Sequence, residues 1–294
     1  MKKLLTLVTL FIVISCNGQK TVKLLENNND NTLLWEVTGN GLSKPSYLFG
    51  TFHLLCKEDI HFSDQLKTAL NRCDTVYMEL KMDDPAVMMG GIIFMTMKDG
   101  KTLKDFYTPA EYEKLEAFFK DSLKMPLMMF QRMKPYFLVS LFYPKMMTCN
   151  SPSGVEMELM KLIREEKKEI KGLETIQFQA SVFDSIPYSW QAKELMKNID
   201  SLYEMKAEFR KMVQLYKNQQ LNSLAELMNE SEFSDDKYGK ILLTNRNVNW
   251  ANKLNSIMKN SSVFVAVGTG HLPGKTGLIS LLREKGYKVV PLKN

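Results

Sequence analysis

The chain has 294 residues, of which 45% are hydrophobic and 24% are charged. Its 39 lysines and arginines against 33 aspartates and glutamates give a formal net charge of +6, spread along the sequence. No dense stripe of basic residues of the kind that nucleic-acid binding requires is present, so we expect no nucleic-acid partner. The length suits one domain of the α/β type with an insertion.

The first residues have the pattern of a secretory signal peptide. Lys2 and Lys3 precede an apolar run that is too short to span a bilayer, and Ser15 and Cys16 follow it. The end of the run, "VISC", resembles the lipobox of bacterial lipoproteins, in which the cysteine becomes the lipidated first residue; an ordinary signal peptide is the alternative. We therefore predict a signal peptide over 1–15, lipidation of Cys16 and a polar tether over 16–32. The expected location is the bacterial cell envelope, anchored to the membrane, with its periplasmic face preferred.

The next segments predict strands separated by helices. A helix is expected at 63–73, where Ser63 is a suitable N-cap. From about 83 to 168 the pattern changes to helices rich in methionine, which predicts an insertion that covers the site as a lid or wall. A methionine surface that binds metal or haem is the alternative. Strands are predicted at 33–39, 46–51, 74–80 and 168–175.

More helices are predicted over about 187–259, followed by a strand at 263–267 and a helix at 274–285. Strands interleaved with helices favour a mixed, mostly parallel sheet flanked by helices, within a single α/β domain over 33–294. In such sheets, ligands bind beyond the carboxyl ends of the strands.

Three cysteines remain besides Cys16: Cys56, Cys73 and Cys149. In an oxidising envelope, a disulfide between Cys56 and Cys73 is one interpretation, and buried structural thiols are the other. Because no C-x-x-C pair is present, neither a zinc knuckle nor a thioredoxin-like site is indicated.

Two of the three histidines occur in the same local pattern. "FGTFH" (49–53) and "VGTGH" (267–271) each place Gly-Thr-x-His after an apolar strand, which presents His53 and His271 at strand ends. Glu79 closes a third apolar strand, "VYMEL". Arg246 lies on a predicted amphipathic helix, where it either stabilises an oxyanion or is simply solvated. Two imidazoles and a carboxylate suit a divalent transition metal or a general base with an orienting acid.

The last histidine is followed closely by "GKT", the end of a P-loop. A P-loop needs a glycine five residues before Gly274, and Thr269 occupies that position. We therefore expect no nucleotide, and the glycines of this turn are interpreted as presenting His271.

Five segments together resemble the TraB/GumN family, which includes bacterial envelope proteins and the Tiki metalloproteases of animals. The resemblance implies an α/β fold related to erythromycin esterase and to a haem-binding lipoprotein, with a helical insertion. It also implies a hydrolytic centre in which His53, His271 and Glu79 hold a metal and Arg246 borders the site. Glu174 lies near the same edge without an assigned role. The segments are "YLFGTFHLL" (47–55), "DTVYMEL" (74–80), "GLET" (172–175), "LLTNRNVNWANKL" (242–254) and "VGTGHLPGKTGLISLLREKGYKV" (267–289).

The function that follows is a metal-dependent hydrolase of the cell envelope, acting on a peptide or a small ester. A divalent transition metal of the Mn, Co or Zn class would lower the pKa of a bound water. A metal-free version stays open, in which His53 is the general base and Glu79 orients it. The alternative function is a non-catalytic envelope lipoprotein that binds or sequesters a peptide signal or haem, and a weaker one is a scaffolding lipoprotein.

Overall fold

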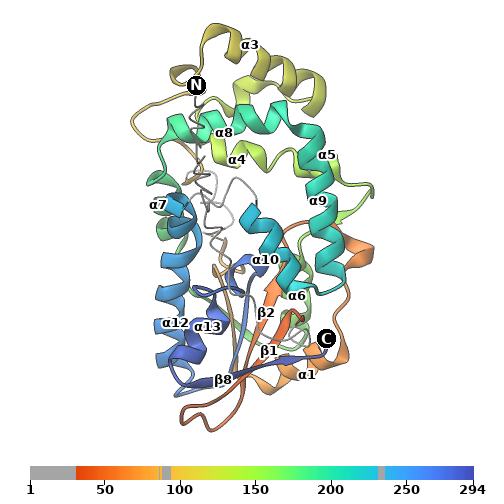
Figure 1. Cartoon of the computed structure of the whole chain (residues 1–294), viewed down its shortest axis with the longest axis vertical. Helices are drawn as coiled ribbons and strands as arrows, with labels where there is room; N and C mark the ends of the chain where they lie inside the picture. Colours follow the sequence, from red (N-terminus) through yellow and green to blue (C-terminus); the bar gives the residue numbers. More distant parts are fainter. Residues whose placement is uncertain (1–30, 86, 88–93, 231–235) are drawn as a thin grey trace, which may run out of the picture.

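A six-stranded sheet forms the centre of the protein, in the order β6-β4-β7-β2-β1-β8. The computed structural model describes residues 31–85, 87, 94–230 and 236–294 (Figure 1). Strands β6, β4, β7 and β2 are parallel neighbours, while β1 is antiparallel to both β2 and β8. The protein therefore has the predicted α/β fold with a mixed, mostly parallel sheet. The strands are β1 (Leu34–Gly39), β2 (Ser46–Thr51), β4 (Thr75–Met78), β6 (Glu169–Gly172), β7 (Val263–Gly268) and β8 (Tyr287–Leu292).

Helices cover both faces of this sheet, which explains why the central strands are continuous apolar runs. Every residue of β2 and of β4 is buried, and so are the first five residues of β7. The predicted first helix is confirmed, because the Ser63 side chain accepts a hydrogen bond of 3.0 Å from the backbone N–H of Leu66. The helices that contribute buried residues to this core include α1 (Asp64–Arg72), α6 (Val155–Glu165), α12 (Asn245–Ile257) and α13 (Leu278–Glu284).

A second, helical core lies beyond one edge of the sheet, in the upper part of Figure 1. It contains much of the methionine-rich segment and also residues of α8 and α9. The methionines divide between two environments: Met97 and Met146 are buried, whereas 79% of Met128 and 75% of Met129 are exposed. The elements here are η3 (Leu103–Asp105), α3 (Pro109–Phe118), η4 (Phe119–Leu123), η5 (Leu127–Phe130), α4 (Pro135–Val139), α5 (Tyr143–Met146), α8 (Tyr188–Asp200) and α9 (Leu202–Lys217).

The two cores meet at the loop that follows β2. Phe52 packs against Phe209 and Tyr216 of α9, with ring centroids 6.2 Å and 5.1 Å away, and it touches both cores. The helical layer therefore adjoins the residue next to His53. The remaining elements are β3 (Leu55–Cys56), η2 (Lys57–Asp59), β5 (Pro152–Ser153), α7 (Ile176–Asp184), α10 (Leu221–Glu230), α11 (Asp236–Gly239), η7 (Lys240–Thr244) and η8 (Thr269–His271).

Neither interpretation of the cysteines holds for all three, because the structure has no disulfide between Cys56 and Cys73 and not every one of them is a free thiol. Cys56 is bonded to Cys149, and Cys73 is a free, buried thiol. Cys56 belongs to β3, which pairs with β5, and Cys149 lies just before β5. Cys73 instead ends α1, where its side chain faces the core beside Ser262. Strand pairing across the fold, rather than closeness in sequence, selected the partner.

The predicted start of the last helix is also wrong, because α13 begins at Leu278 and not at 274. Gly277 is its N-cap, and a Cβ on Gly277 would come within 2.1 Å of the Pro273 carbonyl oxygen. The chain is therefore folded back tightly over 273–277 before the helix starts.

In the part of the chain that the structure describes, no helix is long and apolar enough to cross a membrane. The signal peptide, Cys16 and almost all of the tether predicted above lie outside the described residues.

Candidate functional site

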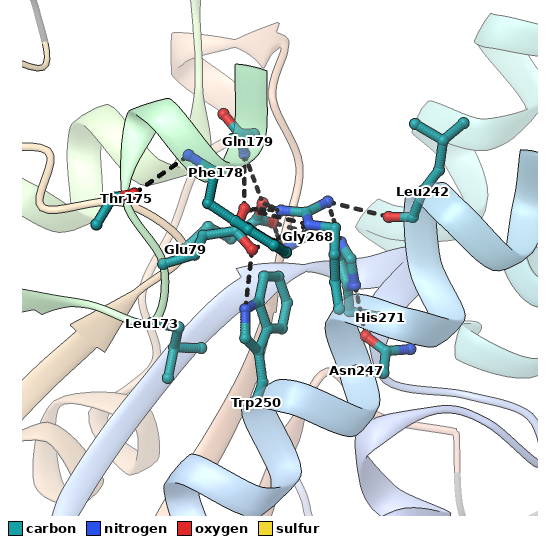
Figure 2. A network of polar contacts seen from close by, with 12 residues as sticks. Glu79, Leu173, Thr175, Phe178, Gln179, Leu242, Asn247, Trp250, Gly268 and His271 are labelled. Atoms are coloured by element: carbon teal, nitrogen blue, oxygen red, sulfur yellow. Dashed lines mark hydrogen bonds and ion pairs between the residues drawn. The ribbon is translucent and has the colours of Figure 1, made fainter. Parts of the chain in front are cut away.

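The predicted site residues converge at the carboxyl edge of the parallel strands. Glu79 directly follows β4, His53 comes two residues after β2, and His271 ends the short helix η8 after β7. Since these three strands are parallel neighbours, their carboxyl ends lie at one edge of the sheet. Arg246 reaches the same place from α12, and Glu174 reaches it from the loop after β6. Figure 2 shows the polar network that includes Glu79 and His271, with Asn247 and Trp250 of α12 beside it.

Gly268 provides the space that these groups share. A Cβ on this residue would lie 3.2 Å from Glu79 Oε1, 3.7 Å from His271 Cδ2 and 3.9 Å from His53 Nε2. The Gly268 backbone N–H donates to Glu79 Oε1 at 2.9 Å. Glu79 Oε1 in turn lies 3.7 Å from His271 Nε2. The missing side chain at Gly268 therefore leaves a small recess with two imidazoles and a carboxylate around it.

Arg246 is buried, and it bridges two carboxylates. Its Nη2 donates to Glu79 Oε2 at 2.6 Å and to Glu174 Oε1 at 2.7 Å, and its Nε donates to both oxygens of Glu174. Trp250 Nε1 donates to Glu174 Oε2 at 3.0 Å, and the guanidinium lies over the Trp250 ring at 4.6 Å. Gln179 adds a hydrogen bond of 3.2 Å to Glu174. Arg246 is thus a fixed part of the site and not a solvated cation.

The two partners of His271 determine which of its nitrogens carries the proton. Nδ1 is 2.6 Å from the side-chain oxygen of Asn247, and Nε2 is 3.2 Å from Arg246 Nη1. The Asn247 amide nitrogen donates to the Thr276 carbonyl at 2.8 Å, which orients its oxygen towards the ring. Nδ1 must therefore donate and Nε2 must accept. Burial lowers the pKa of His271 to about 4, so the ring is neutral at neutral pH.

The carboxyl group of Glu79 stays ionised. Burial raises its pKa, but the charge that His271 carries once acid has protonated it, together with the charges of Arg246 and His53, outweighs this effect and holds the pKa at about 2. Glu174 differs, because burial raises its pKa despite its hydrogen bond with Arg246. The site therefore combines a strongly acidic carboxyl group, a neutral imidazole and a permanently charged guanidinium.

His53 stands at the open side of the recess, with 80% of its side chain exposed. Its Nδ1 lies 2.8 Å from Oε1 of Glu156 on α6, an ion pair in which the ring N–H is not aligned for a hydrogen bond. Glu156 raises the pKa of His53 to about 9, although the partial removal of the ring from water acts in the opposite direction. His53 is therefore largely protonated near neutral pH.

Sequence reasoning missed Glu156 and Asn247, although helical spacing held a signal for both. Leu159 and Met160, three and four residues after Glu156, are buried core residues of α6. Trp250, three residues after Asn247, is likewise buried on α12. A polar side chain on the buried stripe of an amphipathic helix needs a partner, and so it indicates a site.

The chain is similar to known proteins over most of its length. The model of the TraB/PrgY/gumN family matches residues 33–291. Metalloprotease TIKI1 of Danio rerio is 21% identical over 314 residues, an alignment that covers 88% of this chain and 63% of that protein. The chain thus spans less than two thirds of the length of this curated relative. No solved structure matches.

Proposed function

The chain belongs to the TraB/PrgY/gumN family, and from this premise we propose that it is a metal-dependent hydrolase of a peptide or small ester bond. The observation that carries the proposal is the convergence of His53, Glu79 and His271 around the recess at Gly268. The similarity to a protein named as a metalloprotease supports the same reaction class.

The residues present fit a divalent transition metal of the Mn, Co or Zn class. Imidazole nitrogens and a carboxylate oxygen are the donors that such ions take, and the recess at Gly268 lies beside all three. When bound, the ion would supply a Lewis acid that lowers the pKa of water and polarises a carbonyl group. The three donor atoms do not all lie within 4.8 Å of one another in the described part of the chain. Metal binding therefore requires the side chains to move closer together, and exposed His53 is the freest to do so.

The second atom of each donor group already has a partner. Asn247 holds Nδ1 of His271, which leaves Nε2 as the acceptor, and a metal at Nε2 would have to replace Arg246 Nη1, which lies 3.2 Å away. Arg246 holds Oε2 of Glu79, while Oε1 lies beside Gly268. Partners of this kind orient metal-binding side chains and maintain their protonation states.

The protein residues also provide acid–base chemistry. Glu79, with its low pKa, is ionised at neutral pH and can accept a proton or bind a cation. In the metal-free version, where His53 is not a ligand, its protonated ring can give a proton to a leaving amine or alkoxide at the open side. Arg246 uses its N–H groups on Glu79, Glu174, His271 and the Leu242 carbonyl, so its main role is to hold the carboxylates in place.

Metal titration into the metal-stripped full chain tests this proposal. We expect wild type to bind one equivalent of Mn²⁺, Co²⁺ or Zn²⁺ in calorimetry and to cleave members of a peptide and ester panel. His53→Ala and His271→Ala should each lose both properties. The exposed His61 supplies a matched control, His61→Ala, which should behave like wild type. Binding without any cleavage would favour the sequestering alternative, and wild type that binds no metal would refute the proposal.

The location of the protein is a second proposal, based on residues 1–16. We propose that Cys16 is the lipidated first residue of the mature protein and tethers it to the membrane of the bacterial envelope. Cys16→Ser should move the protein from the membrane fraction to the soluble fraction. Mass spectrometry that finds Cys16 unmodified, or cleavage at another position, would contradict this.

A further inference from the structure

We propose that Glu156 positions His53 and belongs to the functional centre. The inference rests on the proposed function for the role of His53, although the contact itself does not depend on it. Glu156 Oε1 lies 2.8 Å from His53 Nδ1, and the carboxylate is mostly buried, with 14% of the side chain exposed.

The backbone holds the two residues together from both sides. The Val155 N–H donates to the Phe52 carbonyl at 2.9 Å. A backbone hydrogen bond therefore joins the residue before Glu156 to the residue before His53. A Cβ on Gly154 would come 2.8 Å from the His53 carbonyl oxygen, and only glycine permits this approach. Pairing of β3 with β5 and the disulfide of Cys56 with Cys149 link the same two segments. The backbone of the two segments therefore fixes the distance between Glu156 and His53, which does not depend on the side-chain conformations alone.

The packing of α6 directs the Glu156 carboxylate towards His53. Val155, Leu159 and Met160 fix α6 against the sheet, and Glu156 is on the side that faces the site. A carboxylate removed from water needs a compensating cation or hydrogen bond. His53 supplies it, and Glu158, two residues further, instead bonds to Lys161 and Ser153.

The arrangement determines what the other nitrogen of His53 can do. An imidazole whose Nδ1–H faces a carboxylate has its Nε2 directed away, and here Nε2 is the atom near Gly268. Carboxylates that act in this way select the tautomer and the ring orientation of metal-binding histidines. The Nδ1–H is not aligned for a hydrogen bond in the present rotamer, which is common before a ligand is bound. Asn247 has the same position relative to His271, so each histidine has its own orienting partner.

Two variants of α6 separate this role from simple helix packing. Glu156→Gln keeps the size of the side chain and removes its charge, and Glu158→Gln makes the same change on the same helix away from His53. Zinc affinity should fall about 10- to 100-fold in Glu156→Gln, the usual cost of losing such a partner. It should stay within about twofold of wild type in Glu158→Gln, because Glu158 bonds away from the site.

Nuclear magnetic resonance of the histidine rings provides the second readout. The chain has three histidines, so their ring nitrogens can be assigned in protein labelled with ¹⁵N-histidine. In zinc-free wild type near neutral pH, we expect the ring ¹⁵N shifts of His53 to report a protonated Nδ1, because this nitrogen lies 2.8 Å from Glu156 Oε1. In Glu156→Gln these shifts should move towards those of an unprotonated Nδ1, and in Glu158→Gln they should stay as in wild type.

The outcomes distinguish this inference from the proposed function. Wild type that binds no zinc refutes the metal proposal, and the ring spectra of the zinc-free protein still decide the role of Glu156. Equal zinc affinity and an unchanged His53 spectrum in Glu156→Gln would overturn the inference while leaving the hydrolase proposal intact. Should Glu156→Gln not fold, an unprotonated His53 Nδ1 in wild type near neutral pH would overturn it alone.

Discussion

Acidification of the metal-free protein should destabilise it through His271. The groups around this ring are Glu79 at 3.7 Å, Arg246 at 3.2 Å and Asn247 at 2.6 Å, with His53 across the recess. Burial dominates and lowers the pKa of His271 from 6.5 to about 4. An unfolded chain binds a proton at this residue near pH 6.5, whereas the folded protein does so only near pH 4. The free energy of unfolding therefore decreases as the pH falls between these two values.

The size of the effect follows from the difference between the two pKa values. A drop from 6.5 to about 4, at about 1.4 kcal/mol per pH unit, gives a loss of about 3 kcal/mol. Two other site groups act outside most of this range. His53, whose pKa is raised to about 9, stabilises the fold fully below pH 6.5 and loses this contribution as the pH rises towards 9. Glu79, whose pKa is lowered from 4.5 to about 2, costs stability only below pH 4.5.

Urea denaturation followed by circular dichroism measures this effect between pH 7.5 and 4.5 with a chelator present. Wild type should lose about 2–3 kcal/mol of unfolding free energy between pH 6.5 and 4.5. In His271→Gln the loss of unfolding free energy over the same pH range should be smaller than in wild type by about 2–3 kcal/mol, whatever the absolute stability of the variant. The exposed His61 gives the control His61→Gln, whose pH dependence should follow that of wild type. Parallel curves for wild type and His271→Gln would refute the reasoning.

Three further changes test other features of the site and its support. Gly268→Ala places a Cβ 3.2 Å from Glu79 Oε1, so zinc affinity should fall at least about tenfold with the circular dichroism spectrum unchanged; wild-type affinity would contradict the shared recess. Arg246→Met leaves two buried carboxylates without their cation and should cost about 3–5 kcal/mol in urea denaturation, and a loss below about 1 kcal/mol would show that the network contributes little. Replacing Cys56 and Cys149 by serine removes a disulfide between residues 93 positions apart, and the free energy of unfolding should fall by about 2–4 kcal/mol. An unchanged melting temperature would argue against this disulfide.

Local patterns in the sequence were sufficient for the strands and for the chemical nature of the site. A short, continuous apolar run bounded by turn residues can be recognised without knowing its distant neighbours, so β2, β4 and β7 were visible in advance. Gly-Thr-x-His after such a run places a histidine at a strand end, and two runs in parallel strands must end at one edge. The positions of His53 and His271 at the carboxyl edge follow from this repeated pattern.

Other features depended on which segments meet across the fold. The partner of Cys56 was set by the pairing of β3 with β5, and strand pairing cannot be read from the spacing of cysteines. The start of α13 was set by the tight fold before Gly277. Both are contacts between residues whose own sequence neighbourhoods allow more than one structure.

The protonation of the site shows the same division. The sequence by itself determined that the site contains imidazole, carboxylate and guanidinium groups, because these are properties of residue types and of local strand ends. Only the tertiary structure decided that His271 is neutral and His53 protonated, since burial governs the first pKa and Glu156 on a distant helix governs the second. A pKa depends on the surroundings within a few ångström of the group, and these surroundings exist only after α6, α12 and the sheet have packed together.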